Sequence, residues 1–109
     1  MKSTPYIADR TTAQWQELDR QHYLHPFTDY KNLHAKGSRV IVKAEGVYLY
    51  DSEGNRMLDG MAGLWCVNLG YGRKYLAEAA YRQLLELPYY NSFFQTAHPP
   101  AIELAKQLV

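Results

Sequence analysis

Apolar side chains recur at helical spacing over residues 73–87, in the most regular pattern of the chain. They line one stripe of the predicted helix: Leu76, Ala79, Ala80, Leu84 and Leu87. The charged residues of this segment fall largely outside the stripe, as in a helix that buries one face. Pro88 cannot continue the hydrogen bonds of a helix, so we predict that the helix ends before it.

A second helical pattern follows His98-Pro99-Pro100, because proline is favoured in the first turn of a helix. This pattern continues to Val109 without a glycine cap or a terminating proline. We therefore expect the sequence to stop inside a helix and to be an incomplete part of a larger protein.

A shorter helix is predicted near the N-terminus, where Trp15, Leu18 and Tyr23 recur at roughly helical spacing. Thr12 is the predicted cap of its first turn. Its predicted end is His25-Pro26, because a residue before proline avoids the helical region. Residues 27–38 mix polar residues and glycine without a period, which predicts an ordered but irregular connection.

Residues 39–60 are rich in β-branched and aromatic residues that are punctuated by glycine. Three short strands are predicted, in the segments RVIVKAEG, VYLYDSEG and NRMLDG. The connections at residues 44–46 and 52–55 are short enough for antiparallel hairpins, so the strands should form a meander. A sheet this small needs another element packed on it.

These patterns divide the chain into three stretches. Residues 1–38 hold the N-terminal helix and the irregular segment, residues 39–72 the meander and a loop rich in glycine and tryptophan, and residues 73–109 the two later helices.

Composition narrows the class of protein further. The 109 residues, 47% of them hydrophobic and 21% charged, allow one globular domain. The formal net charge of +1 gives no electrostatic reason to expect nucleic acid or an anionic membrane as partner. No stretch resembles a signal peptide or a run of about 18 apolar residues. The single cysteine cannot form an intramolecular disulfide, which favours a reducing, cytoplasmic location.

Glycine surrounds a tryptophan in residues 59–72, a composition that suits close backbone approach beside a flat apolar group. Two interpretations are open. The glycines turn the chain while Trp65 and Val67 fill a core, or the segment forms the wall of a ligand site. Gly70-x-Gly72 lacks the third glycine of a dinucleotide loop and the Gly-Lys-Ser/Thr of a P-loop.

Other residues with reactive side chains have structural interpretations. Cys66 lies between apolar neighbours, which favours a buried structural thiol over a nucleophile. The four histidines lack metal-ligand spacing: His22, His25, His34 and His98. Three carboxylates at strand ends or in hairpins are predicted to form turns: Asp51, Glu53 and Asp59.

An aromatic cluster follows the helix that ends before Pro88, and it consists of Tyr89, Tyr90, Phe93 and Phe94. So dense a cluster in a loop must be covered by something. The residues alone leave two choices open, a core within the chain or a subunit interface with some aromatics facing a substrate.

Three segments together resemble the start of class III (omega) aminotransferases, which depend on pyridoxal 5'-phosphate. They are HPFTDY at residues 25–30, AEGVYLYDSEGNRMLDGMAGLWCVNLGYGR at 44–73, and LPYYNSFFQTAHPPAIELA at 87–105. The resemblance is strongest to the members that use pyruvate as amino acceptor, including the polyamine or putrescine and the amine:pyruvate aminotransferases.

The resemblance implies an α/β protein of fold type I, in which a small domain draws on both chain ends and a large domain carries the cofactor. This chain would supply the N-terminal part of the small domain and helices leading into the large one. Residues matching Phe27, Trp65 and Phe93 line the substrate pocket in this family, the last of them close to the partner subunit of a homodimer.

The same resemblance places the catalytic lysine and the cofactor-binding residues beyond the position of Val109. We therefore assign no catalytic, cofactor-binding or metal residue to this chain and expect no stable binding of pyridoxal 5'-phosphate to it alone. The implied reaction moves an amino group from a primary amine or diamine, such as putrescine or another polyamine, to pyruvate. The alternative is an inactive truncated product that acts only as a subunit-interaction fragment.

Overall fold

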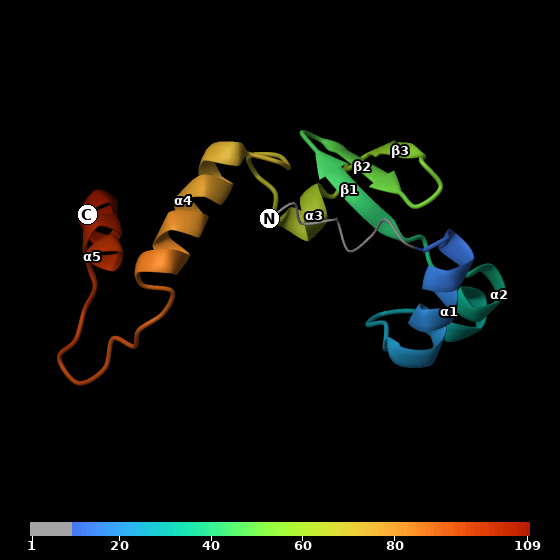
Figure 1. Cartoon of the computed structure of the whole chain (residues 1–109), viewed down its shortest axis with the longest axis horizontal. Coiled ribbons are helices and arrows are strands. Elements are labelled where there is room, and N and C mark those ends of the chain that lie inside the picture. The colour runs from blue at the N-terminus through green and yellow to red at the C-terminus, as the bar shows by residue number, and fades with distance from the viewer. Residues whose placement is uncertain (1–9) are drawn as a thin grey trace. The chain divides into compact units, whose positions relative to one another are not determined.

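The computed structural model describes residues 10–109, which form two compact units. The first unit extends to Gly72 and the second comprises Arg73–Val109. Figure 1 shows the helices of both units and the small sheet of the first. The mixture of helices with a short antiparallel sheet confirms the predicted kind of fold.

Helix α1 spans Thr12–His22 and begins one residue earlier than its predicted cap implies. Thr11 is the N-cap, because its hydroxyl accepts a hydrogen bond from the Gln14 amide while Gln14 Oε1 accepts one from the Thr11 amide. Thr12 lies inside the helix, where its hydroxyl shares a 2.7 Å hydrogen bond with Ser52. The helix also ends before His25-Pro26, since Tyr23 is already extended.

Helix α2 spans Tyr30–Lys36, so the prediction of an irregular connection over residues 27–38 was wrong. The helix is stabilised at both ends. Asp29 caps it by accepting hydrogen bonds from the amides of Lys31 and Asn32, and Gly37 closes it with a positive φ of 76°. Seven residues are too few for a hydrophobic period to be visible in the sequence.

The meander is confirmed: β1 (Ile41–Glu45), β2 (Tyr48–Asp51) and β3 (Arg56–Leu58) form one antiparallel sheet in the order β1-β2-β3. Asp51 ends β2 and shapes the turn to β3, since its carboxylate accepts hydrogen bonds from the amides of Glu53 and Asn55 and from the Asn55 side chain. These bonds, the Asn55 side chain first, hold the pKa of Asp51 below its usual value.

The second unit contains two helices, as predicted: α4 (Lys74–Glu86) and α5 (Pro99–Leu108). Leu87, the residue before Pro88, is extended and ends α4. Pro99 occupies the first turn of α5. None of the described helices is both long and apolar enough to cross a membrane.

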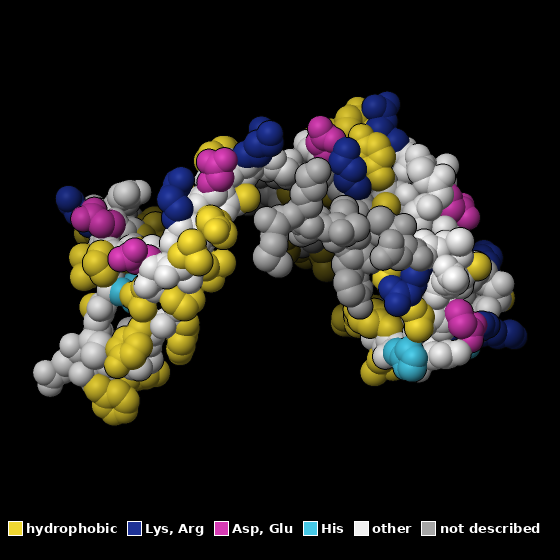
Figure 2. Space-filling model, in the orientation of Figure 1, with side chains coloured by type: hydrophobic (Ala, Val, Ile, Leu, Met, Phe, Trp, Pro, Cys, Tyr) yellow, Lys and Arg dark blue, Asp and Glu magenta, His cyan; other side chains and the backbone are white. Residues whose placement is uncertain are grey.

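Hydrophobic side chains remain accessible throughout both units. Among residues 10–109, no hydrophobic side chain is buried, and the one buried polar residue is Asp51, at 7% exposure. In Figure 2 hydrophobic atoms lie at the surface along α4, next to its charged residues. Within the described residues, the apolar stripe that predicted this helix is therefore largely exposed.

Candidate functional site

The three residues predicted to line a substrate pocket all lie in loops or tight turns. Phe27 precedes α2, Trp65 ends the short element α3 (Ala62–Trp65), and Phe93 lies between α4 and α5. Phe27 is fully exposed, Trp65 is 83% exposed and Phe93 is 72% exposed. The first two belong to the first unit and the third to the second unit.

Backbone strain in the described residues is confined to these three loops. A positive φ occurs at six non-glycine residues: Phe27, Ala62, Leu64, Trp65, Phe94 and Gln95. Each such residue costs on the order of 1–3 kcal/mol and persists only where its surroundings hold it. Two of the predicted residues, Phe27 and Trp65, are themselves strained, and Phe93 precedes two strained residues.

The element α3 is one turn with left-handed backbone. Its residues have φ values of 48° at Ala62, 59° at Gly63, 63° at Leu64 and 66° at Trp65. Each left-handed residue other than glycine costs roughly 1–2 kcal/mol, because its Cβ crowds the next carbonyl oxygen. Something outside the turn must therefore hold it.

Asp59 stabilises this turn. Its Oδ2 accepts hydrogen bonds from the Gly63 amide (2.8 Å) and the Tyr71 hydroxyl (2.6 Å), and its Oδ1 accepts one from the Met61 amide (3.2 Å). The Tyr71 hydroxyl, first among these donors, lowers the pKa of Asp59, and Asp59 in return raises the pKa of Tyr71. The prediction that Asp51 and Asp59 form turns is confirmed, and Glu53 lies in the turn that Asp51 shapes.

Two interpretations of the tryptophan segment change. Trp65 does not fill a core of the first unit, and Val67 is only half-buried. Cys66 is exposed, so the prediction of a buried thiol was wrong. Its thiol donates to the carbonyl oxygen of Leu64 at 3.4 Å.

The loop of Phe27 is tied to α1. His25 Nε2 lies 2.8 Å from Asp19 Oδ1, and the Tyr30 hydroxyl donates to the His25 carbonyl oxygen at 2.9 Å. The Thr28 hydroxyl donates to the carbonyl oxygen of Pro26, which closes the turn around Phe27. The side chain of Phe27 thus projects from a loop that these hydrogen bonds fix.

The loop of Phe93 has its own polar frame. The Phe93 amide donates to Asn91 Oδ1 at 3.0 Å, and the Thr96 hydroxyl lies within hydrogen-bond distance of the carbonyl oxygens of Asn91 (2.9 Å) and Phe93 (2.7 Å). The aromatic cluster is exposed: Tyr89, Tyr90, Phe93 and Phe94. No core within the described residues of the second unit covers it.

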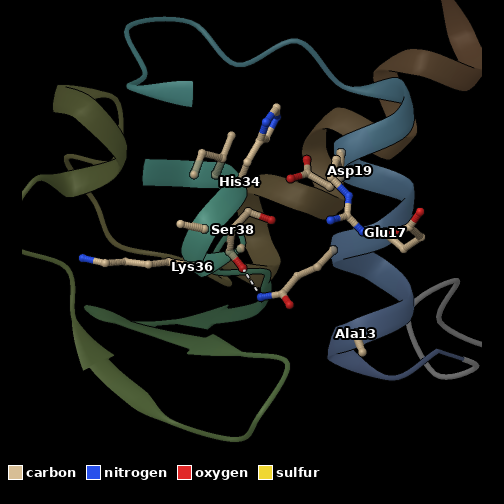
Figure 3. Close-up of a pocket in the computed structure, with 11 residues that line it drawn as sticks. Ala13, Glu17, Asp19, His34, Lys36 and Ser38 are labelled. Carbon is tan, nitrogen blue, oxygen red and sulfur yellow. Dashed lines mark hydrogen bonds and ion pairs between the residues drawn. The ribbon is translucent and has the colours of Figure 1, made fainter. Parts of the chain in front are cut away.

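A groove of about 410 Å³ between α1 and α2 was not predicted, because α2 was not predicted. Its lining mixes polar and apolar side chains (Figure 3). Glu17 pairs with Arg20, and Asp19 pairs with His25, which is not part of the lining. Gln16 Nε2 donates to the Ser38 carbonyl oxygen at 2.9 Å and links the two sides. The groove is therefore the line along which the two helices meet.

Comparison with known proteins identifies the family. Residues 30–109 match the class-III aminotransferases, and the chain belongs to this family. It is 65% identical, over 102 residues, to the putrescine–pyruvate aminotransferase of Pseudomonas aeruginosa, covering 94% of this chain and 22% of the relative. It is 41% identical, over 98 residues, to the mitochondrial gamma-aminobutyrate transaminase 1 of Oryza sativa subsp. indica, covering 90% of this chain and 16% of the relative.

Solved structures agree. An (S)-enantioselective omega-transaminase from Thermomicrobium roseum aligns with a TM-score of 0.85 at 46% identity, covering 91% of this chain and 22% of that one. The omega-transaminase from Pseudomonas jessenii in complex with PMP gives a TM-score of 0.80 at 40% identity, with coverages of 85% and 20%. The chain thus spans about a fifth of the length of these relatives.

The family implies pyridoxal phosphate, but the described residues do not fit its site. A Schiff-base lysine is activated by burial or by a neighbouring cation. The described lysines are all exposed: Lys31, Lys36, Lys43, Lys74 and Lys106. Lys43 pairs with Glu45 at 2.8 Å, and this partner raises its pKa, which is the opposite of activation. No described group of three or more His, Cys, Asp or Glu residues is placed to hold a metal ion.

Proposed function

We propose that this chain forms the N-terminal part of an aminotransferase that moves an amino group from a primary amine or diamine to pyruvate. The observation that carries the proposal is the 65% identity to a putrescine–pyruvate aminotransferase over 102 residues. Relatives named for other substrates are less similar, with 41% identity over 98 residues in one case and 47% over 70 residues in another.

In this proposal Phe27, Trp65 and Phe93 form an aromatic part of the substrate pocket. Exposed rings on fixed loops can pack against the methylene chain of an amine and exclude water from the reacting atoms. They shape the pocket and carry no proton. The reactive lysine and the groups that hold the cofactor belong to other parts of the complete subunit. That subunit would contain a small domain built partly from residues 1–72 and helices from residues 73–109 that lead into the large domain.

We further propose that the complete protein is a cytoplasmic homodimer. The exposed aromatic cluster of residues 89–94 supports the dimer, because a patch of this kind suits a subunit interface. A free, exposed Cys66 suits a reducing compartment.

A chimera tests the reaction. Residues 1–109 would replace the matching part of the Pseudomonas aeruginosa relative, and alanine formation would be followed with putrescine and pyruvate. We expect transfer from the diamine to pyruvate. A folded chimera that holds its cofactor but takes amino groups only from amino acids would contradict the proposal.

The same chimera allows a test of the packing between α1 and α2. Gly37→Ala is expected to lower the free energy of unfolding by about 1–3 kcal/mol, because φ 76° with ψ 160° is accessible in practice only to glycine. An added Cβ would also lie 2.5 Å from Gln16 Nε2. Chemical denaturation measures the loss, and the Gln16→Ala background separates backbone strain from the lost hydrogen bond. An unchanged free energy of unfolding in both backgrounds would contradict the claim that the backbone at position 37 requires glycine.

A further inference from the structure

We propose that Asp59 and Tyr71 are positioning residues that set where Trp65 stands in the amine-binding pocket, an inference that rests on the proposed function. The two side chains form a continuous link from the sheet to the tryptophan. The sequence alone predicts Asp59 only as a turn former.

The link begins at the sheet. The amide of Tyr71 donates to the carbonyl oxygen of Gly46 at 2.7 Å, and the Gly46 amide donates back to the Tyr71 carbonyl oxygen at 3.1 Å. The Asp59 amide donates to the Val47 carbonyl oxygen at 2.9 Å. Both residues are therefore fixed to the hairpin between β1 and β2 by their backbones.

The link continues through the two side chains. The Tyr71 hydroxyl lies 2.6 Å from Asp59 Oδ2, and the same oxygen accepts the Gly63 amide at 2.8 Å. Tyr71 also lies against the turn itself, since a Cβ on Gly63 would be 3.0 Å from its hydroxyl oxygen. One carboxylate oxygen thus joins the sheet-bound tyrosine to the middle of the left-handed turn.

The link ends at Trp65. The Trp65 amide donates to the Met61 carbonyl oxygen at 2.9 Å, and the Met61 amide donates to Asp59 Oδ1 at 3.2 Å. Trp65 has a φ of 66° and an exposed ring, so the direction of the ring depends on the backbone of the turn. A change at the Asp59–Tyr71 contact should move the ring without removing any group that touches substrate.

The charge states suit this task near neutral pH. The Tyr71 hydroxyl lowers the pKa of Asp59, so the carboxylate stays ionised as an acceptor. The carboxylate raises the pKa of Tyr71, so the hydroxyl stays protonated as a donor. A hydrogen bond to an ionised acceptor is shorter and stronger than one between neutral groups.

A double-mutant cycle in the holoenzyme chimera tests the inference. Tyr71→Phe removes only the hydroxyl, and we expect it to raise KM for putrescine roughly tenfold, as loss of a hydrogen bond to a charged group can, while kcat changes little. In the Trp65→Ala background the same substitution should have no further effect on KM, because Tyr71 would act through the missing ring. Tyr81→Phe on α4 is the matched control, with an exposed ring outside the three loops.

The outcomes of this test distinguish a failure of the inference from a failure of the proposed function. The inference is overturned if Tyr71→Phe leaves KM unchanged, or if its increase in KM multiplies with the increase caused by Trp65→Ala. Amine transfer by the parent chimera would still uphold the proposed function. A folded, cofactor-bearing parent that fails to use amines overturns the function instead. Should Tyr71→Phe not accumulate as folded protein, Asp59→Asn tests the same contact in the same cycle, and a lower unfolding midpoint without a change in KM would equally overturn the inference.

Discussion

Gly63→Ala is expected to destabilise the complete subunit by about 2–5 kcal/mol, because it adds left-handed backbone strain to overpacking. Gly63 has a φ of 59°, and an added Cβ would lie 2.7 Å from Val67 Cγ2 and 3.0 Å from the Tyr71 hydroxyl oxygen. Displacing that hydroxyl would also weaken its bond to Asp59. Chemical denaturation of the chimera measures the stability, and KM for putrescine reports on the pocket.

Gly60→Ala is the control for this substitution. Gly60 lies three residues away, and no atom lies within 4 Å of a Cβ placed there. It should behave like the parent in both measurements. Equal effects of the two substitutions would show that the left-handed turn does not account for the loss.

The second large effect concerns residues 1–109 produced alone, which are expected to lack a sharp cooperative unfolding transition. No hydrophobic side chain is buried in the described residues, so little hydrophobic free energy is available to offset the conformational entropy of folding. Calorimetry should give a broad, weak signal, and the dye ANS, which binds exposed apolar surface, should bind strongly. A narrow transition from a soluble monomer would contradict this expectation.

The elements that could be predicted are those whose signals are local. Helix α4 has an apolar stripe with charged residues elsewhere, and the meander has strands rich in β-branched and aromatic residues with short links. Helix α2 was missed because seven residues show no period, although Asp29 and Gly37, its two caps, were visible. The start of α1 could also have been placed at Thr11, because Gln14 follows at the spacing of a capping box, whereas Trp15 follows Thr12 at that spacing.

The candidate site was less accessible from the sequence. Glycine near a tryptophan suggested close backbone approach. Nothing in the sequence indicated the left-handed conformations at Ala62, Leu64 and Trp65, because residues of these types rarely adopt them. The burial of Cys66 was inferred from its apolar neighbours, yet burial depends on what packs from elsewhere in the molecule. The partnership of Asp59 with Tyr71 spans twelve positions and depends on the fold of the loop.

The left-handed conformation of Trp65 has a consequence for substitutions at this position. Most enlargements of a binding pocket weaken a protein, because a smaller side chain leaves a cavity. At position 65 the backbone opposes this trend, since a glycine adopts a φ of 66° without the steric cost that tryptophan bears. Trp65→Gly would therefore widen the proposed pocket wall while relaxing the main chain.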